Sequence, residues 1–247
     1  MRTTEHSVYL YAVVPAHTTV APPYPDVRLV EAGDVGVIVG TTDVGPSTRI
    51  NDPESDPEEL AELARRHDAV VRGVMATADS VLPFRLATVL ADEDAVGAFA
   101  TQHAMELSEQ LDHLAGTQEW GVRVSESPPS SAPVRPQQPD QAEDRPGTAY
   151  LRRRRDAIEE SKRRGGERAE ATAATADHLG SLALERVAGT CGGTTLLDES
   201  YLVRDAQADR FMDAAHRAAE DLQALDLRLR LTGPWPPYSF APPMSEP

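Results

Sequence analysis

Two histidines raise the question of metal or acid–base chemistry. His67 and His103 each fall on an apolar helical stripe, so we expect that they approach each other in a core. A pair of imidazoles is able to bind a metal ion, and together with Arg85 it would be the best candidate for an enzyme site. No Cys, Asp or Glu stands at ligand spacing beside either histidine, and "RRHDAVV" is not the HExxH motif. We therefore predict hydrogen-bonded core histidines, with no metal and no cofactor.

The other reactive groups form no catalytic pattern. Cys191 lies in "GTCGGTT" with no base beside it in sequence, which is typical of a loop cysteine. There is no GxSxG, Walker A or GxGxxG motif, and the glycines of "EAGDVGVIVG" have the wrong spacing for a phosphate-binding loop. The acids of "LADEDAV" are explained by the start of a helix. We predict that the protein is not an enzyme.

One basic run stands out in a chain of net charge −16. It contains Arg152–Arg155, and such runs are able to bind nucleic acid or acidic surfaces. Acids follow at helical spacing, from Arg155 to Glu159 and from Arg163 to Glu167, which favours a solvated, salt-bridged helix face. A role against the acidic remainder of the chain is the alternative. The overall negative charge argues against general nucleic-acid binding, because it repels phosphates.

The hydrophobic pattern of residues 1–124 predicts an α+β domain. We expect a strand at 7–14, a hairpin at 27–42 turning at Gly33, a helix at 58–78 capped by Asp56, a strand at 81–90, a helix from Asp92 to Leu114, and a strand at 119–124. Pro83 removes a backbone donor, so its strand is predicted to be an edge or to be bulged. This order indicates a ferredoxin-like α/β sandwich with an added strand.

The second half of the chain begins with a change of composition. Residues 125–146 are rich in Pro, Ser and acids, which predicts a disordered linker. Residues 147–247 predict a helix-rich α+β domain. It contains a long helix from 147 to 189 that bends or breaks at Gly165 and Gly166, a strand within 194–205, an amphipathic helix at 206–225, and a strand of alternating leucines at 225–231.

The chain ends in a proline-aromatic segment, "LTGPWPPYSF". Three prolines restrict the backbone around Trp235, Tyr238 and Phe240. Because the segment continues a half-buried strand, we predict that its rings cap the core beneath that strand. The alternative is a patch that faces a partner.

Composition places the chain among globular proteins. Its 247 residues, 40% hydrophobic, suit one large or two ordinary domains. The single cysteine rules out an intrachain disulfide and favours the cytoplasm. No apolar run reaches the roughly 18 residues of a membrane span, and the N-terminus has no clear signal peptide.

Six stretches of the sequence are distinctive as a set and in their order along the chain. They are "YLYAVV", "HDAVV", "VLPFRLATVLADEDAV", "EWGVRV", "GTAYLRRRRD" and "LTGPWPPYSF". Together they resemble the GvpL/GvpF family of gas vesicle proteins over nearly the whole chain except the linker. "VLPFRLATV" and "TGPWPPYSF" are the specific parts. The resemblance implies an N-terminal ferredoxin-like domain, a helix-rich C-terminal domain and no catalytic activity.

The resemblance also implies a role and a partner. It implies a cytoplasmic accessory protein, associated with gas vesicles, that binds the small hydrophobic shell protein and other accessory proteins during assembly. The alternatives are a minor component of the vesicle wall and, less favoured, an enzyme that uses His67, His103 and Arg85. The candidates for partner contact lie in the matching stretches and are Pro83, Arg85, Trp120, Trp235, Tyr238 and Phe240.

Overall fold

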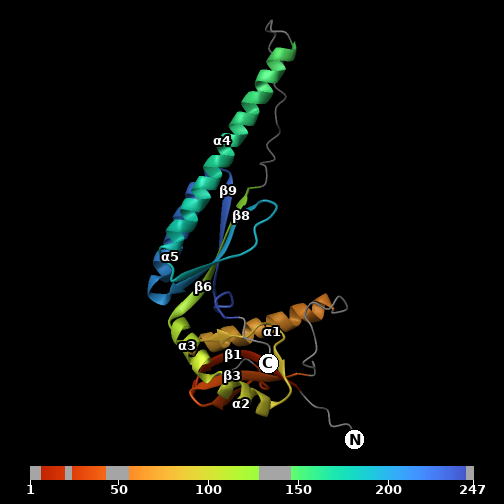
Figure 1. The fold of residues 1–247 in the computed structure, drawn as a ribbon, viewed down its shortest axis with the longest axis vertical. Helices are drawn as coiled ribbons and strands as arrows, with labels where there is room; N and C mark the ends of the chain where they lie inside the picture. Colours follow the sequence, from red (N-terminus) through yellow and green to blue (C-terminus); the bar gives the residue numbers. More distant parts are fainter. Residues whose placement is uncertain (1–6, 20–23, 43–55, 128–145, 243–247) are drawn as a thin grey trace. The chain divides into compact units, whose positions relative to one another are not determined.

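The N-terminal strand is central to a five-stranded antiparallel sheet in the computed structural model (Figure 1). Strand β1 (Ser7–Pro15) pairs with β3 (Val35–Thr42), and β3 pairs with β2 (Arg28–Ala32). Gly33 has φ 65° in the turn between β2 and β3, so the predicted hairpin is confirmed. The other edge of β1 pairs with two short strands, β4 (Leu82–Pro83) and β5 (Val89–Leu90).

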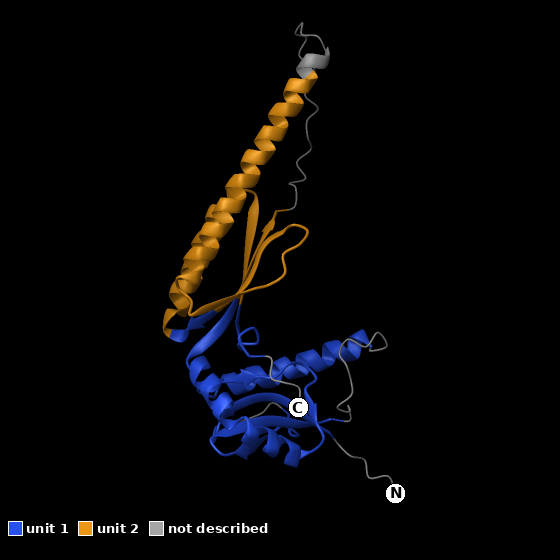
Figure 2. Cartoon of the chain, in the orientation of Figure 1, with its two compact units in different colours: residues 1–120, 202–205, 233–247 blue, residues 121–201, 206–232 orange. Residues whose placement is uncertain are grey.

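The structure describes residues 7–19, 24–42, 56–127 and 146–242, and they form two compact units (Figure 2). The first unit comprises residues 1–120, 202–205 and 233–247, and the second comprises residues 121–201 and 206–232. Residues 128–145, most of the predicted linker, lie outside the described residues. The C-terminal segment therefore belongs to the same unit as β1.

Helices cover both faces of the first sheet (Figure 1). Helix α1 (Pro57–Met75) packs on the face that carries Tyr9 and Tyr11, whereas α2 (Glu93–Gln102) and α3 (Ala104–Leu114) pack on the opposite face. A strand buried on both faces needs apolar residues at every position, which is why "VYLYAVV" shows no alternation. The α+β class is confirmed, but the element order β-β-β-α-β-β-α-α and the two covered faces are not the ferredoxin-like arrangement that we predicted.

Two predicted elements of this unit are interrupted. The strand expected at 81–90 is broken by a turn at residues 84–88, with Ala87 at φ 60°, opposite an irregularity in β1 between Leu10 and Ala12. A bulge bends its strand, so one straight partner cannot follow it. Pro83 does lie in an edge strand, as predicted. The helix expected from Asp92 to Leu114 divides at His103, which ends α2 and precedes α3.

The helix caps are as predicted. The Asp56 carboxylate accepts a hydrogen bond from the backbone N of Glu58, and Asp92 accepts one from the backbone N of Ala95. Each cap satisfies a backbone donor that the first turn leaves without a helical partner.

The remaining strands form a four-stranded sheet in the order β7-β8-β6-β9. Their bounds are β6 (Thr117–Glu126), β7 (Glu185–Ala188), β8 (Thr195–Arg204) and β9 (Leu227–Trp235). The strands predicted at 119–124, 194–205 and 225–231 are thus confirmed as elements. Strand β6 belongs to this sheet and not to the N-terminal one, and β7 lies where we predicted helix. All four residues of β7 are exposed, so the sequence has no alternation of buried and exposed residues there from which a strand could be predicted.

Two helices accompany this sheet, α4 (Pro146–Gly180) and α5 (Ala208–Gln223), with a short 3-10 turn at Asp205–Gln207 before α5. A break of α4 at its glycine pair, one of the two predicted outcomes, does not occur, because the helix is continuous from Pro146 to Gly180. Arg163 bridges the pair by contacting Glu160 at 2.7 Å and Glu167 at 2.6 Å. Contacts at these spacings stabilise a helix and offset part of the glycine cost.

The core of the second unit lies between α4, α5 and β8. Tyr201 and Phe211 are fully buried with ring centroids 5.4 Å apart, and the Tyr201 hydroxyl donates to Glu199 at 2.6 Å. Burial beside that carboxylate raises the pKa of Tyr201 far above its ordinary value, so the hydroxyl stays protonated. Among the described residues, none of the helices combines the length and apolar character that a membrane crossing requires.

Candidate partner-binding site

His67 of α1 is the centre of a buried polar junction in the first unit. Its Nδ1 lies 2.9 Å from the Tyr9 hydroxyl, and its side chain is only 4% exposed. The Tyr9 oxygen accepts a hydrogen bond from the backbone N of Ala87 at 2.9 Å, which leaves its O–H to donate to His67. The rings of Tyr11 and Tyr238 lie 5.6 Å and 6.0 Å from the imidazole. The prediction that His67 is a hydrogen-bonded core histidine is confirmed.

Burial decides the protonation of this junction. Desolvation lowers the pKa of His67 to about 4, against a weaker opposing interaction with the backbone of Phe84. Burial also raises the pKa of Tyr9, Tyr11 and Tyr238 above the ordinary value. At neutral pH the junction therefore contains a neutral imidazole and three neutral phenols. Such a group holds elements together and has no charge to offer a reaction.

An ion pair between Arg66 and Asp26 lies next to the Tyr11 hydroxyl. Arg66 of α1 donates from Nε to the Tyr11 hydroxyl at 3.0 Å and from Nη2 to Asp26 at 2.6 Å. Its guanidinium also lies 4.5 Å from the centroid of the Tyr24 ring. Through these contacts α1 is attached to β1 and to the segment before β2.

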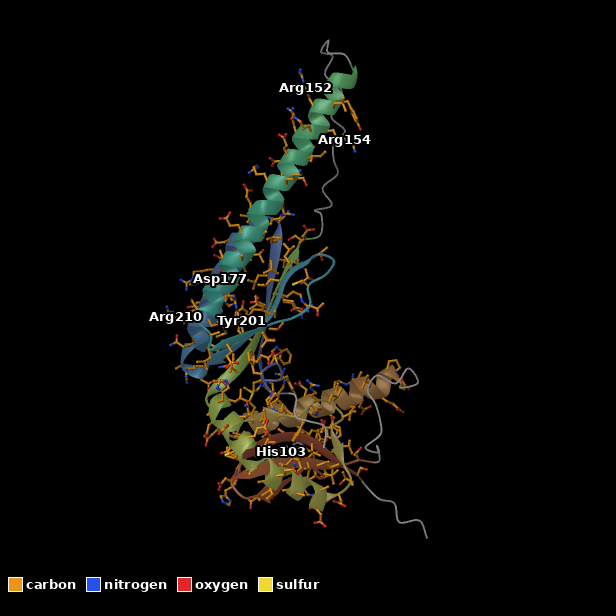
Figure 3. The ribbon with its side chains drawn as sticks, viewed as in Figure 1. His103, Arg152, Arg154, Asp177, Tyr201 and Arg210 are labelled. Atoms are coloured by element: carbon orange, nitrogen blue, oxygen red, sulfur yellow. The ribbon has the colours of Figure 1, made fainter. Side chains whose placement is uncertain are left out.

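His103 does not join His67, so our prediction that the two histidines approach each other is wrong. The His103 ring packs 4.9 Å from that of Phe99, and Phe99 belongs to the core on the other face of the sheet (Figure 3). Arg85 is exposed on the turn between β4 and β5. The two histidines of the enzyme hypothesis thus lie on opposite faces of the first sheet. Among the described residues, no three His, Cys, Asp or Glu side chains are grouped so that they could hold a metal ion.

Trp235 lies against α1 and does not fill the core beneath β9 as we predicted. The Arg72 guanidinium stacks over its indole ring at 4.0 Å, and Arg72 also donates from Nε to Asp68 at 2.8 Å. The Trp235 side chain is only partly buried. A tryptophan in such a position presents a ring edge that another protein can contact.

The residues that follow Trp235 are attached by side-chain contacts within the first unit. Glu119 accepts two hydrogen bonds from Ser239, one from the backbone N at 2.8 Å and one from Oγ at 2.7 Å. Tyr238 packs against the core on the α1 face, and Phe240 packs against the core on the other face. The chain reaches this position past Gly233, at φ 132°, where an added Cβ would lie 3.0 Å from the Trp120 ring. Only glycine fits that passage without strain.

The six candidates for partner contact all lie in the first unit. Pro83 and Trp120 are buried, whereas Trp235, Tyr238 and Phe240 are partly buried and Arg85 is exposed. The two most specific stretches of the sequence, "VLPFRLATV" and "TGPWPPYSF", both contact the pair formed by Tyr9 and His67. The turn that follows Arg85 bonds to Tyr9 through Ala87, and Tyr238 packs on His67, which bonds to the same Tyr9.

Sequence reasoning missed two residues that build this site, Arg72 and Glu119, and it missed the contacts of His67 with Tyr9 and Tyr238. Arg72 and Glu119 read as ordinary surface charges, because their partners lie more than 100 positions away in the chain. The one signal in the sequence was the position of His67 on an apolar stripe.

The family model for the gas vesicle synthesis protein GvpL/GvpF matches residues 7–242. The chain belongs to the GvpL/GvpF family. The match spans both units and includes the C-terminal segment on which the site depends. GvpL/GvpF proteins take part in gas vesicle formation and form a structural and assembly family without enzymatic activity. The resemblance seen in the sequence is thereby confirmed.

The matches to relatives in the family cover most of this chain and 70–82% of the relatives' own length. The chain is 30% identical to gas vesicle protein L of a Streptomyces species over 227 residues, which cover 87% of this chain and 82% of that protein. It is 30% identical to gas vesicle protein L2 of Halobacterium salinarum over 238 residues, with 87% and 81% covered. It is 24% identical to gas vesicle protein L of Haloferax mediterranei, with 87% and 70% covered.

Two crystal structures from the GvpL/GvpF family share the fold. The gas vesicle protein GvpF of Anabaena superposes with a TM-score of 0.67 at 17% identity, covering 98% of each chain. GvpF of Microcystis aeruginosa gives 0.57 at 18% identity, covering 95% of this chain and 98% of the other. At these identities the likeness concerns the fold alone.

Proposed function

We propose that this protein is an accessory factor that binds the small hydrophobic shell protein and assists the assembly of gas vesicles in the cytoplasm. Membership of the gas vesicle synthesis family over residues 7–242 is the observation that carries the proposal. A subunit of a gas-filled shell must have a strongly apolar face, and in free form that face promotes aggregation. A soluble partner that covers the face would prevent this, and a net charge of −16 would keep the complex in solution.

The C-terminal segment on the first unit is the surface that we propose for this contact. Trp235 offers a partly exposed indole stacked on Arg72, and Arg85 adds an exposed cation on the turn that follows β4. Aromatic and arginine side chains are the usual anchors of protein interfaces. Tyr238 and Phe240 pack the segment onto the core of the first unit, and the buried Trp120 ring lies next to the segment at Gly233. Pro83 is buried in β4 and would act only through the position of the turn that carries Arg85.

A pull-down with the shell protein tests the proposal. We expect the full chain to capture it, and we expect Trp235→Ala and Arg85→Ala to weaken capture by at least about tenfold. Arg210→Ala, at an exposed position on α5, is the matched control and should bind like the unchanged protein. Failure of the unchanged chain to capture the shell protein would refute the proposal. Equal binding by all three variants would refute only the proposed surface.

The alternative is that the protein is a minor component of the vesicle wall. Quantifying it in washed, intact vesicles distinguishes the two roles. An assembly factor should be depleted by washing, whereas a wall component should remain at a constant ratio to the shell protein.

A further inference from the structure

The buried stripe of α4 continues beyond the part of the helix that is packed. In the C-terminal half, Thr172, Thr175, Ala176 and Leu179 are buried in the second unit. The same stripe runs toward the N-terminus at spacings of three and four residues, through Arg168, Gly165, Ser161, Ile158, Arg154 and Tyr150. There α4 extends past the ends of α5 and of the strands (Figure 1). In the part of the chain that the structure describes, this half of the stripe is thus presented at the surface without a packing partner.

Large apolar side chains are exposed on this extension. Tyr150 is 55% exposed, Leu151 is 64% exposed and Ile158 is 48% exposed. A solvated helix that served only as a spacer would have polar residues at these positions. Because the three side chains lie on or beside the stripe, they form a seat for another element and not a scattered set.

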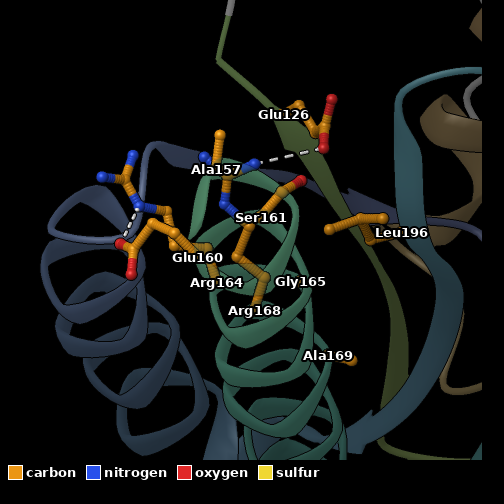
Figure 4. A pocket seen from close by; sticks show the side chains of 9 residues that line it. All are labelled: Glu126, Ala157, Glu160, Ser161, Arg164, Gly165, Arg168, Ala169 and Leu196. Carbon is orange, nitrogen blue, oxygen red and sulfur yellow. Dashed lines mark hydrogen bonds and ion pairs between the residues drawn. The ribbon is translucent and has the colours of Figure 1, made fainter. Parts of the chain in front are cut away.

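A groove lies next to the seat (Figure 4). It encloses about 530 Å³. On the helix side it is lined by the small residues Ala157, Ser161, Gly165 and Ala169 together with the charged residues Glu160, Arg164 and Arg168, and on the strand side by Glu126 of β6 and Leu196 of β8. An added Cβ at Gly165 would meet nothing within 4 Å, so the open space reaches the helix backbone. The ion pair between Arg168 and Glu126, at 3.2 Å, closes one end. Small side chains on one helix let a second helix approach closely.

The charge around the seat is opposite to that of the rest of the protein. Residues 150–164 carry seven basic and three acidic side chains, a charge of +4 in a chain of −16. Arg152 and Arg154 lie on the N-terminal part of α4 (Figure 3), close in sequence to the exposed Tyr150 and Leu151. A neighbouring helix with acidic flanks would be attracted to this surface and one with basic flanks would be repelled.

The packed half of the stripe shows what such an occupant is like. Helix α5 packs against the C-terminal half of α4 and is amphipathic, with Phe211, Ala215 and Leu222 buried. Its side chains include four acids and two arginines, so it is net acidic at neutral pH. We propose that the N-terminal half of α4, with its groove, binds an amphipathic α-helix of a partner protein whose polar face is acidic. This surface belongs to the second unit, whereas Trp235 belongs to the first, and the inference does not depend on shell-protein binding.

Two designed peptides test the charge rule on the full chain. Both are five-turn amphipathic helices with the same leucine stripe, one flanked by glutamates and the other by lysines. Fluorescence anisotropy should show the acidic peptide binding at least about tenfold more tightly, with an affinity that falls as salt is raised. Equal affinities, or tighter binding of the basic peptide, would refute the proposal.

Substitutions locate the site. Tyr150→Asp combined with Ile158→Asp should weaken binding of the acidic peptide by at least about tenfold. Ala174→Asp, an exposed position on the opposite face of the same helix, makes the same kind of change and should leave binding unaltered. Circular dichroism checks that the helix persists in each variant. The proposal is wrong if Ala174→Asp weakens binding equally. It is also wrong if sedimentation shows a dimer of this chain that Ile158→Asp dissociates, because the occupant would then be a second copy.

Discussion

The carboxylate of Glu119 holds Ser239 through two hydrogen bonds, although the two residues are 120 positions apart in the chain. Glu119 is 6% exposed and stands near the start of β6. Its contact fixes the proline-aromatic segment between Trp235 and Phe240 to the first unit. The proposed partner-binding surface therefore depends on one buried acid that contacts no partner itself.

Glu119→Ala should release the C-terminal segment. Both Ser239 donors lose their acceptor, and hydrogen bonds to a charged group contribute roughly 1.5–3 kcal/mol each to stability. With two such bonds lost, we expect the free energy of unfolding to fall by about 3–6 kcal/mol and the segment to become sensitive to protease. Ser239→Ala removes only the hydroxyl contact and should cost about half as much. Urea denaturation of both variants checks the ratio, and equal losses would show that the backbone contact contributes nothing.

Tyr9→Phe should uncouple the turn after β4 from α1. The change leaves the backbone N of Ala87 without its acceptor and His67 Nδ1 without its donor, inside a buried region. Unsatisfied buried groups cost about 1–3 kcal/mol each, so we expect a loss in that range or above it. Tyr24→Phe, at a partly exposed ring, is the control and should change the free energy of unfolding by less than about 0.5 kcal/mol. If Tyr9→Phe lowers the free energy of unfolding no more than this control does, the two hydrogen bonds of Tyr9 do not stabilise the fold.

The stability of the first unit should depend on pH through His67. Its pKa is about 4 in the folded chain, against 6.5 for an unperturbed histidine. As the pH falls from 6.5 toward 4, the unfolded chain binds a proton that the folded chain does not, so the folded state loses stability. The full difference is about 3 kcal/mol, present above pH 6.5 and lost by about pH 4. His67→Gln should lack this part of the pH dependence. If the curves of unfolding free energy against pH are parallel for the two proteins, His67 does not contribute to the pH dependence of stability.

Arg72 and Trp235 should be energetically coupled. A guanidinium over an indole at 4.0 Å contributes about 0.5–1 kcal/mol at a partly exposed site. Because Trp235 is not in a core, Trp235→Ala should cost about 1–2 kcal/mol and not the larger loss of a fully buried ring. A double-mutant cycle with Arg72→Ala measures the coupling directly. Additive losses would mean that the stacking contributes no stability.

Gly166→Ala should stiffen the middle of α4. The glycine is exposed in a continuous helix, and an added Cβ meets nothing within 4 Å. Alanine lowers the cost of the helical conformation by about 1 kcal/mol relative to glycine. We expect slower amide exchange in residues 150–170 with little change in the melting temperature, since this part of α4 is largely exposed. Faster exchange would indicate that the glycine relieves strain.

Helix starts and strand identities follow from local rules and were predictable. Asp56 and Asp92 cap helices in the structure because a side-chain oxygen satisfies a backbone donor two or three residues away, which any local reading of the sequence can detect. The same holds for the turn at Gly33 and for the ion pairs of Arg155 and Arg163 with acids four positions later. The turn at Ala87 that interrupts the strand was not predictable from residues 81–90, because it lies opposite an irregularity in β1, which is far away in sequence.

By itself, the sequence determined the family, the α+β class and the burial of His67, since these depend on motif order, hydrophobic period and the apolar neighbours along one helix. Tertiary structure alone decided that helices cover both faces of the first sheet, that His67 and His103 lie on opposite sides of it, and that Trp235 stacks on Arg72. The physical reason is distance along the chain. A period of 3.6 or 2 residues tells which side of an element is buried, but which element covers that side depends on contacts between residues far apart in sequence.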